Sequence, residues 1–343
     1  MTTPSEKYAK FRRDQKSPLF ADFASLYDFD LDGFQVRACQ ELEAGNGVLV
    51  AAPTGSGKTL VGEFAVHLAL AQGRKCFYTA PIKALSNQKF NDLVDRYGAT
   101  QVGLLTGDNT INGEAPIVVM TTEVLRNMIY AGSRTLAGLG YVVMDEVHYL
   151  ADRYRGAVWE EVIIHLPESV ALVSLSATVS NAEEFGEWLS TVRGATTTIV
   201  EERRPVPLYQ HVMVGRRLYD LFAVREGAGA GEAKVNPDLL KVARDDWRAS
   251  RTSDRRDRRG APRGRAGARG QGVRRSYLPS RFDVVEKLDA EGLLPAIVFI
   301  FSRVGCDAAV TQCLNANLRL TTPEERETIR GFVEERCRNI PDE

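Results

Sequence analysis

Short apolar runs, separated by more polar stretches, recur between residues 48 and 214. Each run is short, is partly β-branched and lacks alternation with polar residues. This pattern is typical of strands that are buried on both faces of a sheet. It predicts strands at Val48–Ala52, Cys76–Thr79, Ile117–Thr121, Tyr141–Met144 and Ala171–Leu175.

Apolar residues recur at helical spacing between several of these runs. One stripe lies within residues 61–68 and another within residues 90–97. Strands that alternate with helices predict an α/β fold, with a parallel sheet covered by helices on both faces. Ligands of such sheets bind at the carboxyl ends of the strands, so candidate chemistry is expected there.

The pattern divides the chain into four segments. Residues 1–28 are expected to form an N-terminal arm that leads into a helix, and residues 29–215 the first α/β domain. Residues 216–281 are expected to be a basic, largely disordered linker, because residues 226–281 hold few apolar side chains to repay the entropy of ordering. Residues 282–343 resume regular structure and are expected to begin a second, incomplete domain.

The last segment is expected to hold one strand and three helices. Two of the helices lie at Phe282–Glu291 and Pro323–Arg338, and the strand lies at Ala296–Phe301. With so few elements, this segment cannot complete a domain of its own.

Composition indicates a globular protein of the cytoplasm. Hydrophobic residues make up 44% and charged residues 26% of the 343 positions. Apolar runs are far shorter than the roughly 20 residues of a membrane span, and the polar N-terminus lacks the apolar core of a secretory signal. The five cysteines form no CxxC pair and the four histidines are scattered, which favours buried thiols over a metal or disulfide role.

The net charge of −1 conceals a strongly basic stretch. Residues 248–275 contain eleven arginines and two aspartates, a local charge of +9, so the remainder carries −10. Two interpretations are open. The stretch either binds phosphates and stacks arginines on bases, or is a solvated flexible linker.

The strongest motif is APTGSGKT at residues 52–59, which follows a predicted strand and opens a predicted helix. This is the context of a phosphate-binding loop, although Ala replaces the usual first Gly. The two glycines let backbone amides face a phosphate, the lysine adds a positive charge, and the threonine hydroxyl can ligate Mg²⁺. The loop consists of Ala52, Pro53, Thr54, Gly55, Ser56, Gly57, Lys58 and Thr59.

Two further motifs end later strands. Asp145 can hold Mg²⁺, and Glu146 can accept a proton from an attacking water. In the SAT motif, Ser176 and Thr178 can hydrogen-bond these carboxylates or His148 and couple the nucleotide state across the sheet. The alternative for SAT is a strand followed by a capped helix.

In this order and spacing, APTGSGKT, DEVH and SAT resemble motifs I, II and III of superfamily-two DExH-box helicases. Longer strings resemble the superkiller-like branch of RNA helicases, related to exosome-associated enzymes, and especially its actinobacterial members. These strings are FDLDGFQ (29–35), YTAPIKALSNQKF (78–90), GLLTGDNTIN (103–112), VMTTEVLRNM (119–128), DEVHYLADRYRGAVWEEVIIHLP (145–167), SATVSNAEEFGEWL (176–189), RPVPL (204–208) and PAIVFIFSRVGCDAA (295–309).

The resemblance implies a RecA-like first domain, the start of a second one, and an ATP-dependent RNA helicase that uses ATP and Mg²⁺ in RNA processing or decay. Gln35 would read the adenine edge, with Phe34 beside it. The implied partners are single-stranded RNA and RNA-decay nucleases. The implied nucleic-acid contacts are Pro81, Lys83, Ala84, Gly107, Asp108, Thr121, Thr122 and Glu123.

The chain also departs from this family. The Gln–Gly–Arg-rich motif that supplies arginine fingers is missing, and GRAGARG at 264–270 lies before motif IV and lacks the leading Gln. Such a finger is worth roughly 10³–10⁵ in turnover. Two alternatives therefore accompany the helicase interpretation: an ATP- and RNA-binding fragment without turnover, and a DNA-directed motor.

Overall fold

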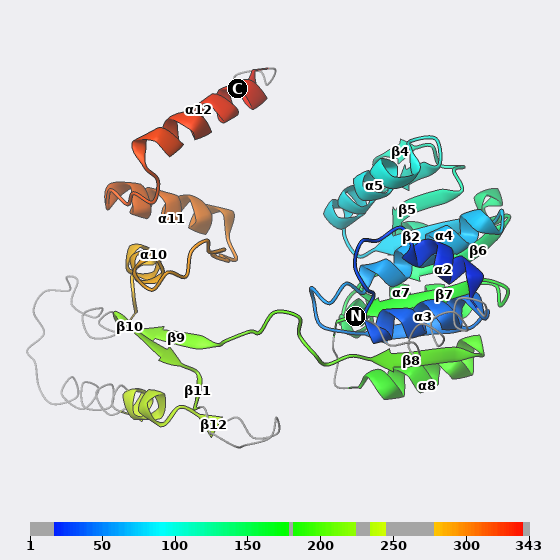
Figure 1. Cartoon of the computed structure of the whole chain (residues 1–343), viewed down its shortest axis with the longest axis horizontal. Helices are drawn as coiled ribbons and strands as arrows, with labels where there is room; N and C mark the ends of the chain where they lie inside the picture. Colours follow the sequence, from blue (N-terminus) through cyan, green and yellow to red (C-terminus); the bar gives the residue numbers. More distant parts are fainter. Residues whose placement is uncertain (1–16, 178–180, 224–233, 245–277, 339–343) are drawn as a thin grey trace, which may run out of the picture. The chain divides into compact units, whose positions relative to one another are not determined.

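The computed structural model describes residues 17–177, 181–223, 234–244 and 278–338 (Figure 1). The chain divides after Pro207 into two compact units, which are described separately. Within the described ranges, no helix combines the length and apolar character that crossing a membrane requires.

The first unit is built on one eight-stranded sheet in the order β4-β3-β5-β2-β6-β7-β1-β8. Every neighbouring pair is parallel except β3 and β4. The strands are β1 (Gly47–Ala51), β2 (Lys75–Ala80), β3 (Val102–Leu105), β4 (Thr110–Ile111), β5 (Ile117–Thr121), β6 (Leu139–Met144), β7 (Ala171–Ser176) and β8 (Thr196–Val200).

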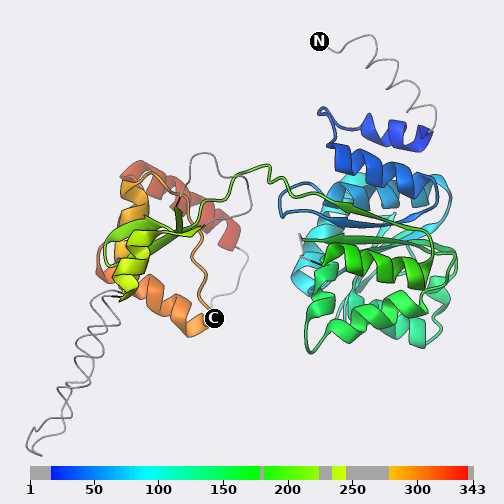
Figure 2. The same cartoon turned by 90° about the horizontal axis from the view of Figure 1, so that it is seen from below.

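Helices cover both faces of this sheet, and Figure 2 shows the blue and the green helices on opposite sides of it. One face carries α2 (Pro18–Ala24), α3 (Gly33–Glu43), α4 (Thr59–Ala71) and α5 (Lys83–Tyr97). The other carries α6 (Thr122–Tyr130), α7 (Gly156–His165) and α8 (Ala182–Arg193). The predicted parallel sheet with helices on both faces is confirmed.

Alternate residues of the central strands supply the two cores. Val48 and Val50 of β1 pack with α3 and α4, whereas Leu49 between them packs with α7 and α8. All three are fully buried. Both faces are therefore apolar, which explains why these strands appear in the sequence as unbroken apolar runs.

The apolar pattern overlooked two kinds of strand. β8 consists of Thr-Thr-Thr-Ile-Val at an edge of the sheet, where only Ile199 is buried. β3 is a short segment that contains Gly103, whose backbone lies against that of Asn112. β-branched threonines favour a strand at a half-exposed edge, but they leave no apolar run.

Part of the expected N-terminal arm belongs to the first core. Phe20 and Phe23 of α2 are buried, and the Phe23 ring lies 5.2 Å from that of Phe64 on α4. The backbone amides of Leu19 and Phe20 donate to the Glu43 carboxylate at the end of α3. The packed domain therefore begins before the expected boundary at residue 29.

The second unit opens with a hairpin of β9 (His211–Val214) and β10 (Arg217–Asp220). Val214 pairs with Arg217 across a turn in which Gly215 has φ +60°, a left-handed conformation that favours glycine. The expected boundary between residues 215 and 216 therefore cuts this hairpin. Arg216 forms ion pairs with Asp283 and Glu286 of α10 (Arg281–Ala290).

The expected disordered linker contains ordered residues. β11 (Phe222–Ala223) pairs with β12 (Lys234–Val235), and residues 237–244 are helical. Asn236 caps this helix by accepting from the amide of Asp238 at 3.0 Å. The whole basic stretch 248–275 lies outside the described residues.

The strand expected at Ala296–Phe301 is wrong, because the structure assigns no strand to these residues. Ile297 and Phe299 are more than four-fifths exposed, as expected for an apolar run that has no partner strand. The two helices expected around it are confirmed as α10 and α12 (Pro323–Cys337), with α11 (Arg303–Asn315) between them.

Candidate functional site

The phosphate-binding loop connects the carboxyl end of β1 to α4, as the sequence predicts. Gly55 and Gly57 have φ +85° and +79°, so both adopt the left-handed conformation that glycine allows. The amide of Ala52 donates to the Ser176 carbonyl at 3.1 Å, which joins the start of the loop to the end of β7. The loop therefore begins next to the SAT motif.

The loop offers unused polar groups that suit a phosphate. Among the described residues, the backbone amides of Gly55, Gly57 and Lys58 donate to no protein acceptor. The Ser56 hydroxyl is buried and also lacks a partner within these ranges. Lys58 is only 6% exposed. Buried donors are normally paired, so this set fits an anionic ligand at the start of α4.

Asp145 follows β6, two strands from β1 in the sheet. Its Oδ2 accepts from the Tyr78 hydroxyl at 2.9 Å, and its Oδ1 accepts from the Glu146 amide at 2.9 Å. Burial, followed by the charge of Asp145, raises the pKa of Tyr78 well above its usual range, so the phenol remains a donor. Sequence reasoning missed Tyr78, although it opens the quoted string YTAPIKALSNQKF.

Glu146 adopts a left-handed backbone with φ +53°, which is uncommon outside glycine and is found at functional sites. Its carboxylate lies 3.2 Å from Nδ1 of His148, and the same ring nitrogen lies 3.5 Å from the Ala177 amide. The DEVH and SAT segments thus meet through His148 and a backbone amide. Ser176 is buried at the end of β7, and Thr178 lies outside the described residues.

Gln35 lies against the phosphate-binding loop. Its Nε2 donates to the Gly57 carbonyl at 3.0 Å, and its Oε1 accepts from the Asp32 amide in a capping box of α3. Phe34 is 7% exposed and belongs to the core. Two aromatic residues, Tyr27 and Phe29, border the hollow of about 310 Å³ beside Gln35 and the loop, and Phe29 is 60% exposed. Sequence reasoning missed Phe29, although FDLDGFQ begins with it.

The residues implied to contact nucleic acid lie near the carboxyl ends of neighbouring strands. Lys83 and Asp108 form an exposed ion pair at 2.8 Å, and Lys83 holds the pKa of Asp108 below its usual range. Thr122 is fully buried, so this residue is not exposed to a ligand in the structure. Pro81, Lys83 and Ala84 follow β2, Gly107 and Asp108 follow β3, and Thr121, Thr122 and Glu123 end β5 and open α6.

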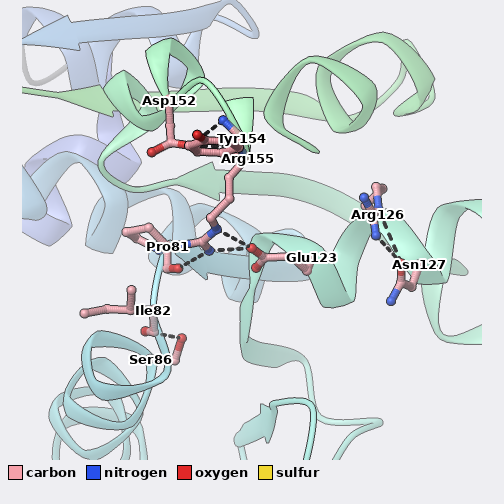
Figure 3. Close-up of polar contacts among 9 residues, drawn as sticks. All are labelled: Pro81, Ile82, Ser86, Glu123, Arg126, Asn127, Asp152, Tyr154 and Arg155. Atoms are coloured by element: carbon pink, nitrogen blue, oxygen red, sulfur yellow. Dashed lines mark hydrogen bonds and ion pairs between the residues drawn. The ribbon is translucent and has the colours of Figure 1, made fainter. Parts of the chain in front are cut away.

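A further residue, Arg155, joins two of these segments (Figure 3). Its Nη2 donates to the Pro81 carbonyl at 2.6 Å, and its Nε donates to Glu123 Oε1 at 3.0 Å. The Glu123 carboxylate is thus engaged by an arginine. Sequence reasoning missed Arg155 although it lies within the quoted string that begins at DEVH, because no spacing rule connects it to Pro81 or Glu123.

The chain resembles known helicases in sequence. Residues 32–185 match the family model for the DEAD/DEAH box helicase. The chain is 61% identical over 321 residues to "Probable helicase HelY" of Mycobacterium tuberculosis, which covers 93% of this chain and 34% of that protein. It is 38% identical to human "Superkiller complex protein 2" over 97% of this chain and 26% of that protein.

Human "Exosome RNA helicase MTR4" is 36% identical over 91% of this chain and 28% of its own length. The chain thus spans about a third of the curated relatives or less. Among solved structures, the Mycobacterium smegmatis helicase Lhr bound to ssDNA and AMP-PNP matches 54% of this chain and 28% of its own, with 28% identity and a TM-score of 0.46. The resemblance drawn from the motifs is confirmed by the family model and the sequence relatives.

Proposed function

We propose that this chain, which carries a DEAD/DEAH box helicase domain over residues 32–185, is the ATP-binding motor part of an ATP-dependent RNA helicase. The observation that carries the proposal is the convergence of three segments at one sheet edge. The loop after β1, the carboxylates after β6 and the SAT segment after β7 end three adjacent strands. The SAT segment contacts each of the other two segments, through the Ala52 amide and through His148.

In this proposal the loop binds the phosphates of ATP. The free amides of Gly55 and Gly57 donate to phosphate oxygens. Lys58 supplies a positive charge that offsets the negative charge of the phosphates. Because Lys58 is buried, little water competes for its ammonium. Phe29 offers its exposed ring to the base, and Gln35 lies next to it.

Thr59 and Asp145 would hold Mg²⁺ together with phosphate oxygens, a ligand set of one hydroxyl and one carboxylate that suits this ion. Among the described residues, no group of three or more His, Cys, Asp and Glu side chains could hold a metal alone, which fits a metal that arrives with its nucleotide. When bound, Mg²⁺ supplies charge neutralisation on the phosphates. Glu146 then accepts the proton of the attacking water, and His148 fixes its carboxylate.

RNA is the proposed nucleic acid. Support comes from relatives whose names state it, such as the chloroplast "DExH-box ATP-dependent RNA helicase DExH15" of Arabidopsis thaliana, 41% identical over 87% of this chain. Backbone amides and small hydroxyls at the ends of β2, β3 and β5 suit sequence-independent phosphate contacts. Partners in RNA decay are proposed on the same basis, from the name of the exosome relative.

A competition experiment tests this choice. Labelled single-stranded RNA bound to the chain is displaced by unlabelled RNA or DNA of matched sequence. The proposal expects RNA to displace the label at lower concentration than DNA. Equal or better displacement by DNA would favour the DNA-directed motor instead.

Binding without turnover is a second candidate function for this chain. It is favoured by the missing arginine-finger motif and by the exposed apolar run near Phe299. We expect the 343-residue chain to bind ATP but to show little RNA-stimulated hydrolysis, and a chain lengthened to carry the motif to hydrolyse ATP. In the longer chain, Glu146→Gln should lose hydrolysis and keep ATP affinity. Robust RNA-stimulated hydrolysis by the 343-residue chain, lost in Glu146→Gln, would refute the arginine-finger argument.

A further inference from the structure

Arg155 is the one described side chain that hydrogen-bonds both the Pro81 segment and Glu123 (Figure 3). Pro81 lies just before α5, and Glu123 lies in the first turn of α6. These helices follow β2 and β5, which are paired neighbours in the sheet. A single guanidinium therefore fixes the spacing between two segments of the proposed nucleic-acid surface.

The guanidinium is itself held firmly. The backbone amide of Arg155 donates to Asp152 Oδ1 at 2.8 Å, and the guanidinium carbon lies 5.5 Å from the ring centre of the buried Trp159. The side chain is only about one-third exposed. A planar fork that already lies over an aromatic ring loses little further freedom when it bonds two acceptors.

The segment that carries Arg155 begins at the proposed hydrolytic carboxylates. Successive backbone hydrogen bonds run from Tyr149 to Glu146, from Asp152 to Tyr149, and from Gly156 to Asp152, each 2.9–3.0 Å long. They enclose the short helix η2 (Val147–Ala151). A displacement of Glu146 therefore acts on Arg155 through a short hydrogen-bonded segment.

We propose that Arg155 is the positioning residue through which nucleotide binding and nucleic-acid binding act on each other in this chain. The inference rests on the proposed function and adds to it a residue that acts through Pro81 and Glu123. A bound strand would fix the spacing of the starts of α5 and α6, and Arg155 would transmit that spacing to the segment of Glu146. Coupling between two sites is reciprocal, so each ligand would change the affinity of the other by the same factor.

The alternative is an ion pair that merely stabilises the fold. Such a pair would change the free energy of unfolding but would leave the coupling between the two ligands intact. The discriminating quantity is the coupling factor, which is the ratio of RNA dissociation constants without and with a saturating, non-hydrolysable ATP analogue and Mg²⁺. Coupling factors of about 5–150 are typical.

The experiment measures this factor by fluorescence anisotropy of a short labelled single-stranded RNA. The 343-residue chain is compared with Arg155→Gln, with Arg155→Lys and with the control Arg126→Gln. Arg126 lies on α6 and contacts its neighbour Asn127 and Glu161 of α7, so the control removes the same charge nearby. Thermal unfolding and the affinity for the analogue alone establish that each variant is folded.

We expect Arg155→Gln to lower the coupling factor at least about fivefold, toward one, while the affinity for the analogue alone stays at the parental value. Arg155→Lys keeps the charge but cannot fork to two acceptors, so its factor should fall between those of Arg155→Gln and the parent. Arg126→Gln should keep the parental factor. A parental factor in folded Arg155→Gln, or in Arg155→Lys if Arg155→Gln does not fold, would overturn the inference.

Two outcomes of the parent chain separate this inference from the proposed function. A parent that binds neither the analogue nor RNA would contradict the proposed function itself. A parent that binds both ligands with no coupling would leave the proposed site in place and overturn the role of Arg155.

Discussion

At the scale of single residues, the site depends on how neighbouring groups orient two adjacent carboxylates. Asp145 is held by the Tyr78 hydroxyl and by a backbone amide, and Glu146 occupies a left-handed conformation that turns it toward His148. Backbone strain of this kind costs about 1–3 kcal/mol and persists where the surrounding structure enforces it. The two carboxylates therefore have different partners although they are adjacent in the chain.

Removing the Tyr78 hydroxyl should weaken the metal-dependent part of ATP binding. In Tyr78→Phe, Oδ2 of Asp145 loses a donor, and we expect the affinity for Mg-ATP to fall roughly tenfold, the equivalent of about 1.4 kcal/mol. Calorimetric titrations of ATP, one series in Mg²⁺ and one in a chelator, measure this affinity. The difference between Tyr78→Phe and the parent should disappear in the chelator.

Tyr141→Phe is the matched control for this prediction. Tyr141 is likewise buried, and its hydroxyl donates to Gln72 at 2.9 Å, away from the carboxylates that follow the end of the strand. Its loss should leave Mg-ATP affinity unchanged. An equal loss of affinity in both variants, or in neither, would show that Tyr78 does not orient Asp145.

At the scale of elements, α2 packs in the core, whereas the loop after it borders the proposed base pocket. Phe23 of α2 is fully buried against Phe64, whereas Phe29 is exposed at the proposed base pocket. We expect Phe23→Ala to lower the free energy of unfolding by about 3–5 kcal/mol. Phe29→Ala should change it by less than about 0.5 kcal/mol but weaken ATP binding, since base stacking on an aromatic ring is worth about 1–3 kcal/mol.

Denaturant unfolding and ATP titration of both variants check this pair of effects. Each variant serves as the control for the other, because both remove one phenyl ring from the same stretch of chain. Loss of stability in Phe29→Ala, or unchanged ATP affinity in that variant, would contradict the assignment of Phe29 to the pocket.

At the scale of the whole molecule, the basic stretch 248–275 concentrates charge that the rest of the chain lacks. If it neutralises about five phosphates of a single strand, its replacement by an uncharged linker of equal length should reduce the slope of log affinity against log salt by roughly 3.5. RNA titrations over a range of salt concentrations measure this slope. An unchanged slope would favour the flexible-linker interpretation.

The sequence predicts the sheet of the first unit well because its central strands are buried on both faces and so remain apolar throughout, as in β1. The edge strand β8 escaped prediction because its threonines are half-exposed. The apolar pattern wrongly predicted a strand at Ala296–Phe301. Its residues are apolar, as in a buried strand, but a strand needs a partner, and the structure pairs this segment with none.

The site residues fall into two groups, those that local motifs reveal and those that depend on contacts made by the folded chain. The loop at Lys58 and the carboxylates at Asp145 depend on local sequence, so the motifs revealed them. Tyr78 and Arg155 act through partners 67 and 74 positions away, which only the folded sheet brings into contact. Phe29 was missed because burial, which sequence alone does not give, distinguishes it from Phe34.

The central claim is that the loop after β1 binds the phosphates of ATP, and calorimetric titration of Mg-ATP into Lys58→Ala tests it most directly. The matched control is Lys75→Ala. Lys75 is the first residue of β2, at the end of the strand away from the proposed site, and it pairs with Glu114. The account predicts that the parent chain and Lys75→Ala bind Mg-ATP with equal affinity and that Lys58→Ala shows no measurable binding. Equal affinity of Lys58→Ala and the parent would contradict it.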